Sequence, residues 1–268
     1  MERKHLKIGL FGFGCVGYGL HEVLEKTPGL QARIARICIK DPSKSRPVSQ
    51  ERFTIDRDEI LKDDSLNVVV ELIDDADAAF DLVREALKRG QAGVTANKKM
   101  IAEHLPELLD LQRLYGSPLL YEAACCASIP IIRNLEEYYD NDMLQSIEGI
   151  VNGSTNYILT KTGRDRISYA DALAQAQQSG YAESDPALDT QGYDAKYKLL
   201  ILLAHAFGMV VSPGEVFHSG IDQLGELELK YAREKNFKIK LVAHARKLDD
   251  GLVSAYVLPR FIRPDEKL

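Results

Sequence analysis

The sequence predicts an α/β fold, with a doubly wound parallel sheet followed by an α+β domain. Strand-like and helix-like segments alternate over about the first 130 residues, and a glycine-rich turn directly follows the first of these strands. After residue 130 the pattern changes to one strand, several helices and a final pair of strands. We therefore expect two domains, at residues 1–130 and 131–268.

In the first half, short apolar runs predict strands, and segments with helical spacing separate them. The strands are expected at residues 6–11, 32–40, 66–73, 92–97 and 117–123, and the helices at 17–26, 77–90 and 100–116. The run at 66–73 is apolar almost throughout, as in a parallel strand buried on both faces. Alternating strands and helices indicate a parallel sheet with right-handed crossovers.

The second half has a mixed pattern. We expect a strand at 145–154 and helices at about 155–162, 168–179, 194–207 and 222–234. Residues 237–259 are typical of two strands joined by the turn Asp249-Asp250-Gly251.

The composition is that of an ordinary globular protein. Of the 268 residues, 45% are hydrophobic and 28% are charged, and the net charge of −6 argues against nucleic-acid or anionic-membrane partners. No apolar run approaches the ~20 residues of a membrane span. The first strand begins too early to leave room for a signal peptide. The 4 cysteines form no Cys-x-x-Cys motif, and we expect a reducing cytoplasm.

The turn after the first strand carries the pattern Gly12-x-Gly14-x-x-Gly17. In this context Gly12 permits a tight turn, Gly14 admits a pyrophosphate close to the backbone, and Gly17 lets the helix pack on the strand. The helix N-terminus then offers N–H groups to the phosphates. A glycine-rich turn without a ligand is the alternative. The pattern favours a Rossmann-like dinucleotide site that includes Gly12, Phe13, Gly14, Cys15, Val16 and Gly17.

The end of the second predicted strand bears on the choice between NAD and NADP. Lys40 and Asp41 stand about where an acidic residue would hold the ribose hydroxyls of NAD. Lys44 and Arg46 add positive charge that suits a 2′-phosphate. We favour NADP slightly, with NAD also accepted, and a solvated basic loop is the alternative.

An acidic and a basic residue share one face of the predicted helix at 194–207. At about 100° per residue, Asp194, Lys198 and His205 fall on the same side. On this segment alone, an exposed ion pair worth a few tenths of a kcal/mol is the simplest interpretation.

Four longer motifs change that interpretation. "VTANKKMIAEH" (94–104), "YEAACCASIPII" (121–132), "VNGSTNYILT" (151–160) and "GYAESDPALDTQGYDAKYKLLIL" (180–202) follow the glycine loop in this order. Together they resemble homoserine dehydrogenases, from about residue 7 to the end of the chain. The resemblance implies an oxidoreductase that interconverts L-homoserine and L-aspartate 4-semialdehyde with NAD(P), toward threonine, isoleucine and methionine.

The resemblance also implies roles for single residues. Lys198 is the expected acid/base, and Asp194 would orient the substrate or the lysine. Glu183 would bind the amino group of the substrate. Lys98 would lie between nicotinamide and substrate, which makes it both a catalytic and a cofactor-binding residue. Oxidation of an alcohol needs a base for the hydroxyl proton, and burial beside a second lysine would lower the pKa of a lysine amine toward that use.

A monovalent cation and a second subunit follow from the same resemblance. Na⁺ or K⁺ would be held by the Glu122 side chain and by backbone carbonyls, and the residues concerned are Glu122, Cys125, Ala127 and Ile129. The second domain would bind substrate and form a homodimer.

The chain departs from the family at three places. Cys125-Cys126-Ala127-Ser128 and Asp74-Asp75 stand where the family generally has glycines, and the chain ends before the expected closing segment. Two alternatives therefore remain at this point: another NAD(P)-dependent amino-acid dehydrogenase, or a truncated nucleotide-binding protein without catalysis.

Overall fold

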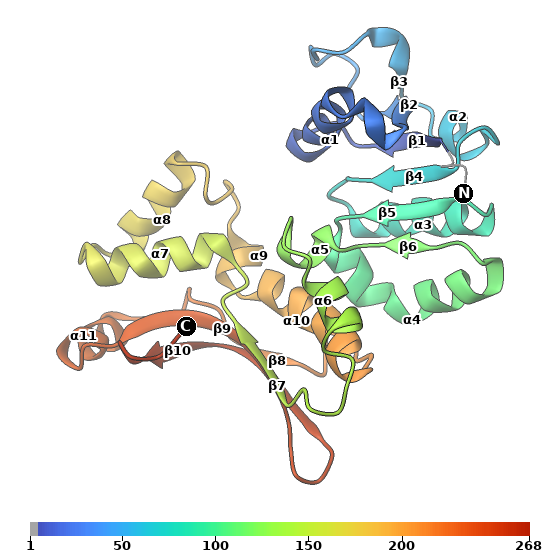
Figure 1. Cartoon of the computed structure of the whole chain (residues 1–268). Coiled ribbons are helices and arrows are strands. Elements are labelled where there is room, and N and C mark those ends of the chain that lie inside the picture. Colours follow the sequence, from blue (N-terminus) through green and yellow to red (C-terminus); the bar gives the residue numbers. More distant parts are fainter. Residues whose placement is uncertain (1–4) are drawn as a thin grey trace. The chain divides into compact units, whose positions relative to one another are not determined.

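The computed structural model describes residues 5–268, which form two compact units, Met1–Ile129 and Pro130–Leu268 (Figure 1). Each unit is built around its own β-sheet. The first unit holds the glycine loop, and the second holds the helix that carries Asp194 and Lys198.

The first unit contains a parallel six-stranded sheet in the order β3-β2-β1-β4-β5-β6. This is the strand order of the two-halved dinucleotide-binding fold, in which the chain reverses its direction of winding at β1. The strands are β1 (Leu6–Phe11), β2 (Ala32–Cys38), β3 (Phe53–Thr54), β4 (Val68–Glu71), β5 (Ala92–Thr95) and β6 (Leu119–Leu120).

Helices of the first unit connect these parallel strands. They are α1 (Cys15–Lys26), α2 (Asp58–Leu61), α3 (Ala76–Lys88), α4 (Lys98–Tyr115) and α5 (Ala123–Cys126), with short 3₁₀ turns η1 (Pro28–Leu30) and η2 (Gln50–Arg52). Side-chain caps fix where the two long crossover helices start. Asp75 accepts the Ala78 N–H at the start of α3, and Asn97 accepts the Met100 N–H at the start of α4.

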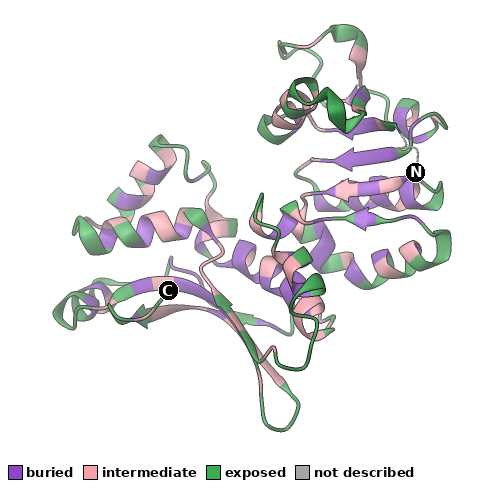
Figure 2. Ribbon diagram, viewed as in Figure 1, coloured by how far each residue is buried: buried purple, intermediate pink, exposed green. Residues whose placement is uncertain are grey.

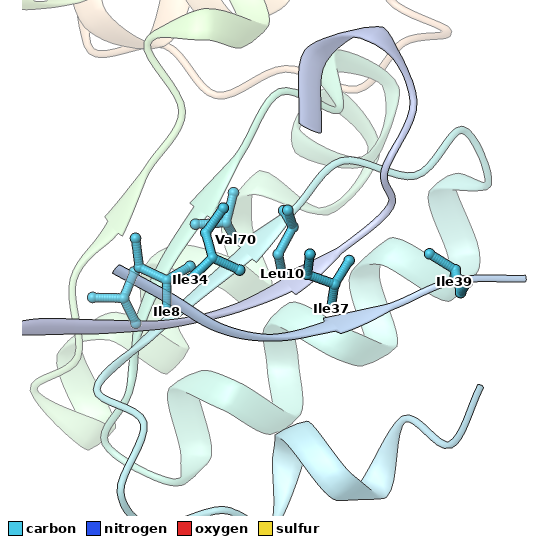
Figure 3. Close-up of a cluster of buried hydrophobic side chains, with 7 residues drawn as sticks. Ile8, Leu10, Ile34, Ile37, Ile39 and Val70 are labelled. Atoms are coloured by element: carbon cyan, nitrogen blue, oxygen red, sulfur yellow. The ribbon is translucent and has the colours of Figure 1, made fainter. Parts of the chain in front are cut away.

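Alternate residues of the central strands supply two separate apolar clusters. One contains Ile8, Leu10, Ile34, Ile37, Ile39, Val68 and Val70 (Figure 3). Leu20 and Leu24 of α1 pack against this cluster. The other contains Phe11, Ile60, Leu61, Leu66, Val69, Leu82 and Ala86, and so includes α2 and α3. Since Val69 and its neighbours point to opposite faces, the sheet is covered on both sides, as the doubly wound prediction requires.

The second unit has a mixed four-stranded sheet in the order β7-β9-β10-β8. Its strands are β7 (Ser146–Gly149), β8 (Phe217–His218), β9 (Lys238–Lys247) and β10 (Val253–Ile262), of which β9 and β10 pair antiparallel along their whole length. Its helices are α6 (Ile131–Glu137), α7 (Gly153–Arg164), α8 (Tyr169–Gln178), α9 (Ala187–Thr190), α10 (Tyr193–Phe207) and α11 (Glu226–Glu234).

Helix α10 is the most buried helix segment of the second unit. Residues 194–197 and 199–203 are all buried, so that Figure 2 shows this helix largely in purple. Gly192, with φ 88°, starts the helix in the left-handed region, and Gly208, with φ 65°, ends it in the same region. The burial overturns the interpretation of Asp194 and Lys198 as an exposed surface pair.

The predicted architecture is confirmed, since both the parallel sheet with its helices and the mixed second sheet are present. The prediction missed β3, α2, α5, α6, α9 and β8. All but one of these are two to four residues long, too short to show a period of 2.0 or 3.6 residues. No helix among residues 5–268 is both long enough and apolar enough to cross a membrane.

The turn after β1 requires glycine at its first position. Gly12 has φ 90°, a Cβ there would meet the Leu72 carbonyl group, and the Gly12 N–H donates to the Cys38 oxygen at 3.0 Å. Gly14 has φ −86°, and no heavy atom lies within 4 Å of where its Cβ would be.

We therefore expect Gly12→Ala to destabilise the protein more than Gly14→Ala. The first variant combines an unfavourable φ with a backbone clash and should lower the free energy of unfolding by about 1–3 kcal/mol. The second changes only the residue that precedes α1 and should cost less than about 1 kcal/mol. Urea unfolding of the two variants measures the difference, and equal losses would contradict the assigned turn.

Candidate active site

The carboxyl ends of the parallel strands place several predicted residues along one edge of the first sheet. Gly12 follows β1, Lys40 follows β2 by two residues, and Lys98 follows β5 by three. In open α/β sheets, ligands bind outside this edge at the point where the winding reverses. Here that point lies between β1 and β4.

The glycine loop offers an open surface at the start of α1. Gly14 is the residue before the helix, and its carbonyl accepts the Tyr18 N–H at 2.9 Å as the first helical bond. A Cβ on Gly17 would lie 2.5 Å from the Gly12 oxygen, so the helix packs closely on the turn that follows β1. Cys15 and Val16 are exposed, with Val16 at 62%. The N–H groups of this first helical turn are therefore available to a phosphate.

A basic pocket of about 330 Å³ follows β2. Lys44 and Arg46 line it together with Phe53 and Thr54 of β3. The Arg46 guanidinium lies 5.5 Å from the centre of the Phe53 ring, and that ring packs edge-on against Phe13 of the glycine loop at 5.3 Å. The pocket is thus joined to the glycine loop through two aromatic side chains.

Lys40 and Asp41 are both exposed at the start of this loop. The Asp41 carboxylate accepts hydrogen bonds from the Ser43 N–H at 2.9 Å and from the Ser43 hydroxyl at 2.6 Å. These bonds lower the pKa of Asp41. The side chain therefore stabilises its own turn, and its contact with a ribose stays a prediction.

A buried carboxylate, which the sequence analysis did not identify, joins the ends of β4 and β5. Glu71 is 0% exposed and accepts hydrogen bonds from the Ile73 N–H at 2.6 Å and the Thr95 hydroxyl at 2.5 Å. Burial raises the pKa of Glu71, while the two hydrogen bonds act in the opposite direction. The only hint in the sequence is an acidic residue at the end of the apolar run "VVVEL".

Lys98 is the first residue of α4 and is half-buried. The preceding residue, Asn97, caps the helix and donates from its amide to the Ile73 oxygen at 3.1 Å. The position of Lys98 is therefore fixed by the ends of β4 and β5. Its approach to Lys198 stays a prediction.

The predicted cation ligands lie on and around α5. Glu122 precedes this helix, Cys125 is buried within it, Ala127 follows it with φ 51°, and Ile129 is exposed. The Cys125 N–H donates to the Glu122 oxygen at 3.2 Å. Residues 5–268 contain no cluster of three or more His, Cys, Asp or Glu side chains that could hold a metal. The resemblance implied the Glu122 side chain together with backbone carbonyls as ligands, and binding of a cation here stays a prediction.

In the second unit, the structure brings Lys198 and Asp194 together within the buried part of α10. The Lys198 Nζ lies 2.8 Å from Asp194 Oδ2 and donates to the Val151 oxygen, also at 2.8 Å. The side chains are 16% and 6% exposed, respectively. Helical spacing predicted the shared face, and Val151 adds a contact from a distant segment.

Asn152 connects this ion pair to a second carboxylate. Its Nδ2 donates to Asp194 Oδ2 at 2.8 Å and to Asp189 Oδ1 at 2.7 Å. Its Oδ1 accepts the Thr155 N–H at 2.8 Å and so caps α7. Ser154 donates to Asp189 Oδ2 at 2.7 Å. The start of α7 and the start of α10 are thereby held together around the lysine.

The sequence analysis did not identify Asp189 or the connection through Asn152. Asp189 lies in the short helix α9, and 37 residues separate it from Asn152. Glu183 is exposed in the loop before α9, where its backbone carbonyl accepts a hydrogen bond from the Gln177 side chain at 3.0 Å. Its expected contact with a substrate amino group stays a prediction.

A second lysine of α10 lies on the other side of the helix. Lys196 is 6% exposed, its Nζ lies 5.0 Å from the centre of the Tyr193 ring, and burial lowers its pKa. Tyr193 also contacts the ring of His218 on β8 at 4.6 Å. Lys196 therefore packs against the sheet rather than within the Asp194–Lys198 group.

The arrangement around Lys198 suits proton transfer. Because the Lys198 amine contacts a carboxylate and donates to a backbone carbonyl, its direction is defined and its side chain has few accessible rotamers. Asp194 stabilises the protonated amine, and Asn152 holds Asp194 in place. Such a group can donate a proton to, or accept one from, a substrate oxygen within hydrogen-bond reach.

We expect Asn152→Ala to destabilise the second unit by about 2–3 kcal/mol. The substitution removes a helix cap and leaves two partly buried carboxylates without a shared donor. Ser154→Ala removes one donor from Asp189 and is the matched control, with a loss of about 1 kcal/mol or less. Thermal and urea unfolding of both variants provide the measurement, and an equal loss in the two would contradict the central place of Asn152.

Comparison with protein families covers nearly the whole chain. The family model described as "Homoserine dehydrogenase, NAD binding domain" matches residues 12–122, and the one described as "Homoserine dehydrogenase" matches residues 130–268. The homoserine dehydrogenase of Lactococcus lactis is 35% identical over 268 aligned residues, which are 96% of this chain and 62% of that relative. The chain thus spans about three-fifths of the length of this relative.

Solved structures give the same result. A homoserine dehydrogenase from Thiobacillus denitrificans matches with a TM-score of 0.92 and 32% identity, covering 98% of this chain and 63% of its own. A hyperthermophilic archaeal homoserine dehydrogenase in complex with NADPH matches with a TM-score of 0.79 and 26% identity, covering 98% and 84%. Because the second family model alone spans more than half of the residues, the chain belongs to the homoserine dehydrogenase family.

Proposed function

We propose that this chain is an NAD(P)-dependent homoserine dehydrogenase, which interconverts L-homoserine and L-aspartate 4-semialdehyde. The observation that carries the proposal is the Lys198–Asp194 pair, buried in α10 and held by Asn152. Family membership of both units supports it. The reaction belongs to the biosynthesis of threonine, isoleucine and methionine.

In this proposal Lys198 moves the proton of the substrate hydroxyl. During oxidation the amine accepts that proton as the hydroxyl carbon becomes an aldehyde, and in reduction the ammonium returns it. NAD(P), when bound, accepts or supplies the hydride. Asp194 orients the lysine or the substrate, Glu183 binds the substrate ammonium, and Lys98 stands between substrate and nicotinamide.

The first unit fits the dinucleotide. The open backbone at Gly14 and the exposed N-terminal turn of α1 suit the pyrophosphate. Gly12, Phe13, Cys15, Val16 and Gly17 complete the loop. The pocket after β2, which Lys44 and Arg46 line, suits the 2′-phosphate of NADP. We therefore propose NADP as the preferred cofactor, with NAD also used and with Lys40 and Asp41 beside the ribose.

Further properties follow from the family and belong to this proposal. A monovalent cation, Na⁺ or K⁺, would be held at Glu122 and at the carbonyls of Cys125, Ala127 and Ile129. The second unit would form a homodimer, and the enzyme would act in the cytoplasm. The first unit would bind the cofactor and the second the substrate.

Loss of the Lys198 amine should abolish turnover without loss of cofactor binding. We expect Lys198→Met to lower kcat for NADPH-dependent reduction of aspartate semialdehyde by about 10²-fold or more, because general acid–base catalysis typically contributes that much. Lys196→Met is the matched control on the opposite side of α10, and it should keep activity. Rates close to wild type in the Lys198 variant would contradict the assignment. A wild-type protein that binds NADPH but reduces no semialdehyde would instead support the non-catalytic alternative.

Removal of positive charge from the pocket after β2 should shift the choice of cofactor. We expect the double variant Lys44→Ala/Arg46→Ala to raise the KM for NADPH about tenfold or more, since a hydrogen bond to a charged group contributes about 1.5–3 kcal/mol. The KM for NADH should stay unchanged. Arg52→Ala, which removes a nearby arginine paired with Glu25, is the control. Equal effects on NADPH and NADH would contradict a 2′-phosphate site.

A further inference from the structure

We propose that Glu71 is a positioning residue of the dinucleotide site, whose carboxylate holds the ends of β4 and β5 and thereby sets the place of Lys98. The inference rests on the proposed function, since it assigns a new role within that site. Glu71 is not in the predicted set of cofactor or substrate contacts. It is completely buried, whereas the glycine loop and the pocket after β2 are open to solvent.

The Glu71 carboxylate receives donors from two different strand ends. One oxygen accepts the Ile73 N–H from the segment after β4, and the other accepts the hydroxyl of Thr95, the last residue of β5. Glu71 and Thr95 are also direct neighbours in the β4–β5 register. The Glu71 side chain therefore adds a direct link between two strand ends that the backbone ladder already pairs.

From these two donors, a chain of hydrogen bonds leads to Lys98. The Thr95 hydroxyl oxygen accepts the Asn97 N–H at 3.0 Å, and the Asn97 amide donates to the Ile73 oxygen at 3.1 Å. Asn97 in turn caps α4, whose first residue is Lys98. A displacement of Glu71 would thus reach Asn97 through two hydrogen bonds, and from Asn97 it would reach the backbone of Lys98.

The same residue also supports the glycine turn. The Leu72 N–H donates to the Phe11 oxygen at 2.8 Å, and the Leu72 carbonyl lies directly against Gly12. Leu72 lies between Glu71 and Ile73, which a hydrogen bond joins, so the segment that packs on Gly12 is held at both of its ends.

The chemistry of the donors explains why a carboxylate stands here. Both partners donate, and an ionised carboxyl group is an acceptor at both oxygens. Burial raises the pKa of Glu71, and the negative charge of Asp74 adds to this, while the two donors favour the ionised form. A glutamine could still accept from the Ile73 N–H and donate from its NH₂ group to the Thr95 hydroxyl, which also accepts hydrogen bonds. A leucine has no polar side-chain atom and would remove both bonds.

The test compares kinetic constants and local structure in four variants. We expect Glu71→Leu and Thr95→Val to lower kcat with homoserine by about tenfold to 10²-fold, because displacement of a reacting group by about 1 Å has effects of that size. The Kd for NADPH should rise by a smaller factor, because the fully buried Glu71 side chain would act on the cofactor only through neighbouring residues. Thr95→Ser keeps the hydroxyl and should restore kcat. Ser117→Ala removes another buried hydroxyl bond, to Leu87, at the opposite edge of the same sheet, and it should leave kcat unchanged.

Amide hydrogen exchange at Ile73 and Asn97 provides a readout that does not depend on turnover. Both amides should exchange faster in Glu71→Leu and Thr95→Val than in the wild type or Thr95→Ser. If Glu71→Leu fails to fold, the Thr95→Val and Thr95→Ser pair decides the question. Wild-type kcat and exchange in Thr95→Val, or an equal loss of kcat in Ser117→Ala, would overturn the inference. Absence of wild-type turnover would overturn the proposed function alone, since the exchange test would still stand.

Discussion

In the proposed mechanism, the ion pair between Lys198 and Asp194 is the interaction on which the chemistry of the second unit depends. Two charged groups in a mostly buried helix carry a desolvation penalty that their mutual attraction only partly offsets. The structure offsets the rest with directed contacts: Val151 accepts from the lysine, and Asn152 donates to the aspartate. Lys196 lacks such a group and packs on Tyr193. This difference separates a lysine suited to proton transfer from one with a packing role.

The first unit also contains a buried carboxylate that accepts hydrogen bonds, but the role of this carboxylate is structural. Glu71 is a buried carboxylate that receives two donors, and it joins the ends of β4 and β5. The backbone forms much of the proposed dinucleotide site, through the turn at Gly12 and the open start of α1 at Gly14. In both units, therefore, a buried acidic group fixes the start of a helix that bears a predicted catalytic lysine.

The sequence was sufficient to predict those features that repeat along the chain or lie within one helix turn. The alternation of strands and helices predicted the parallel sheet, and helical spacing placed Asp194 beside Lys198. Contacts between distant segments could not be predicted from the sequence. Nothing local connects Asn152 to Asp189, or Glu71 to Thr95, because 37 and 24 residues separate the partners. Asp74 and Asp75 stand where the family generally has glycines, and the cap that Asp75 provides to α3 was not predicted from the sequence.

The central claim is that the Lys198 amine transfers a proton to and from the substrate hydroxyl. A crystal structure of the protein with NADP and L-homoserine tests it most directly, through the distance from the Lys198 Nζ to the substrate hydroxyl oxygen. The account predicts a hydrogen bond of about 2.6–3.2 Å, with Asn152 still bound to Asp194. A substrate hydroxyl bound well beyond hydrogen-bond reach of Lys198, with another side chain in contact, would contradict it.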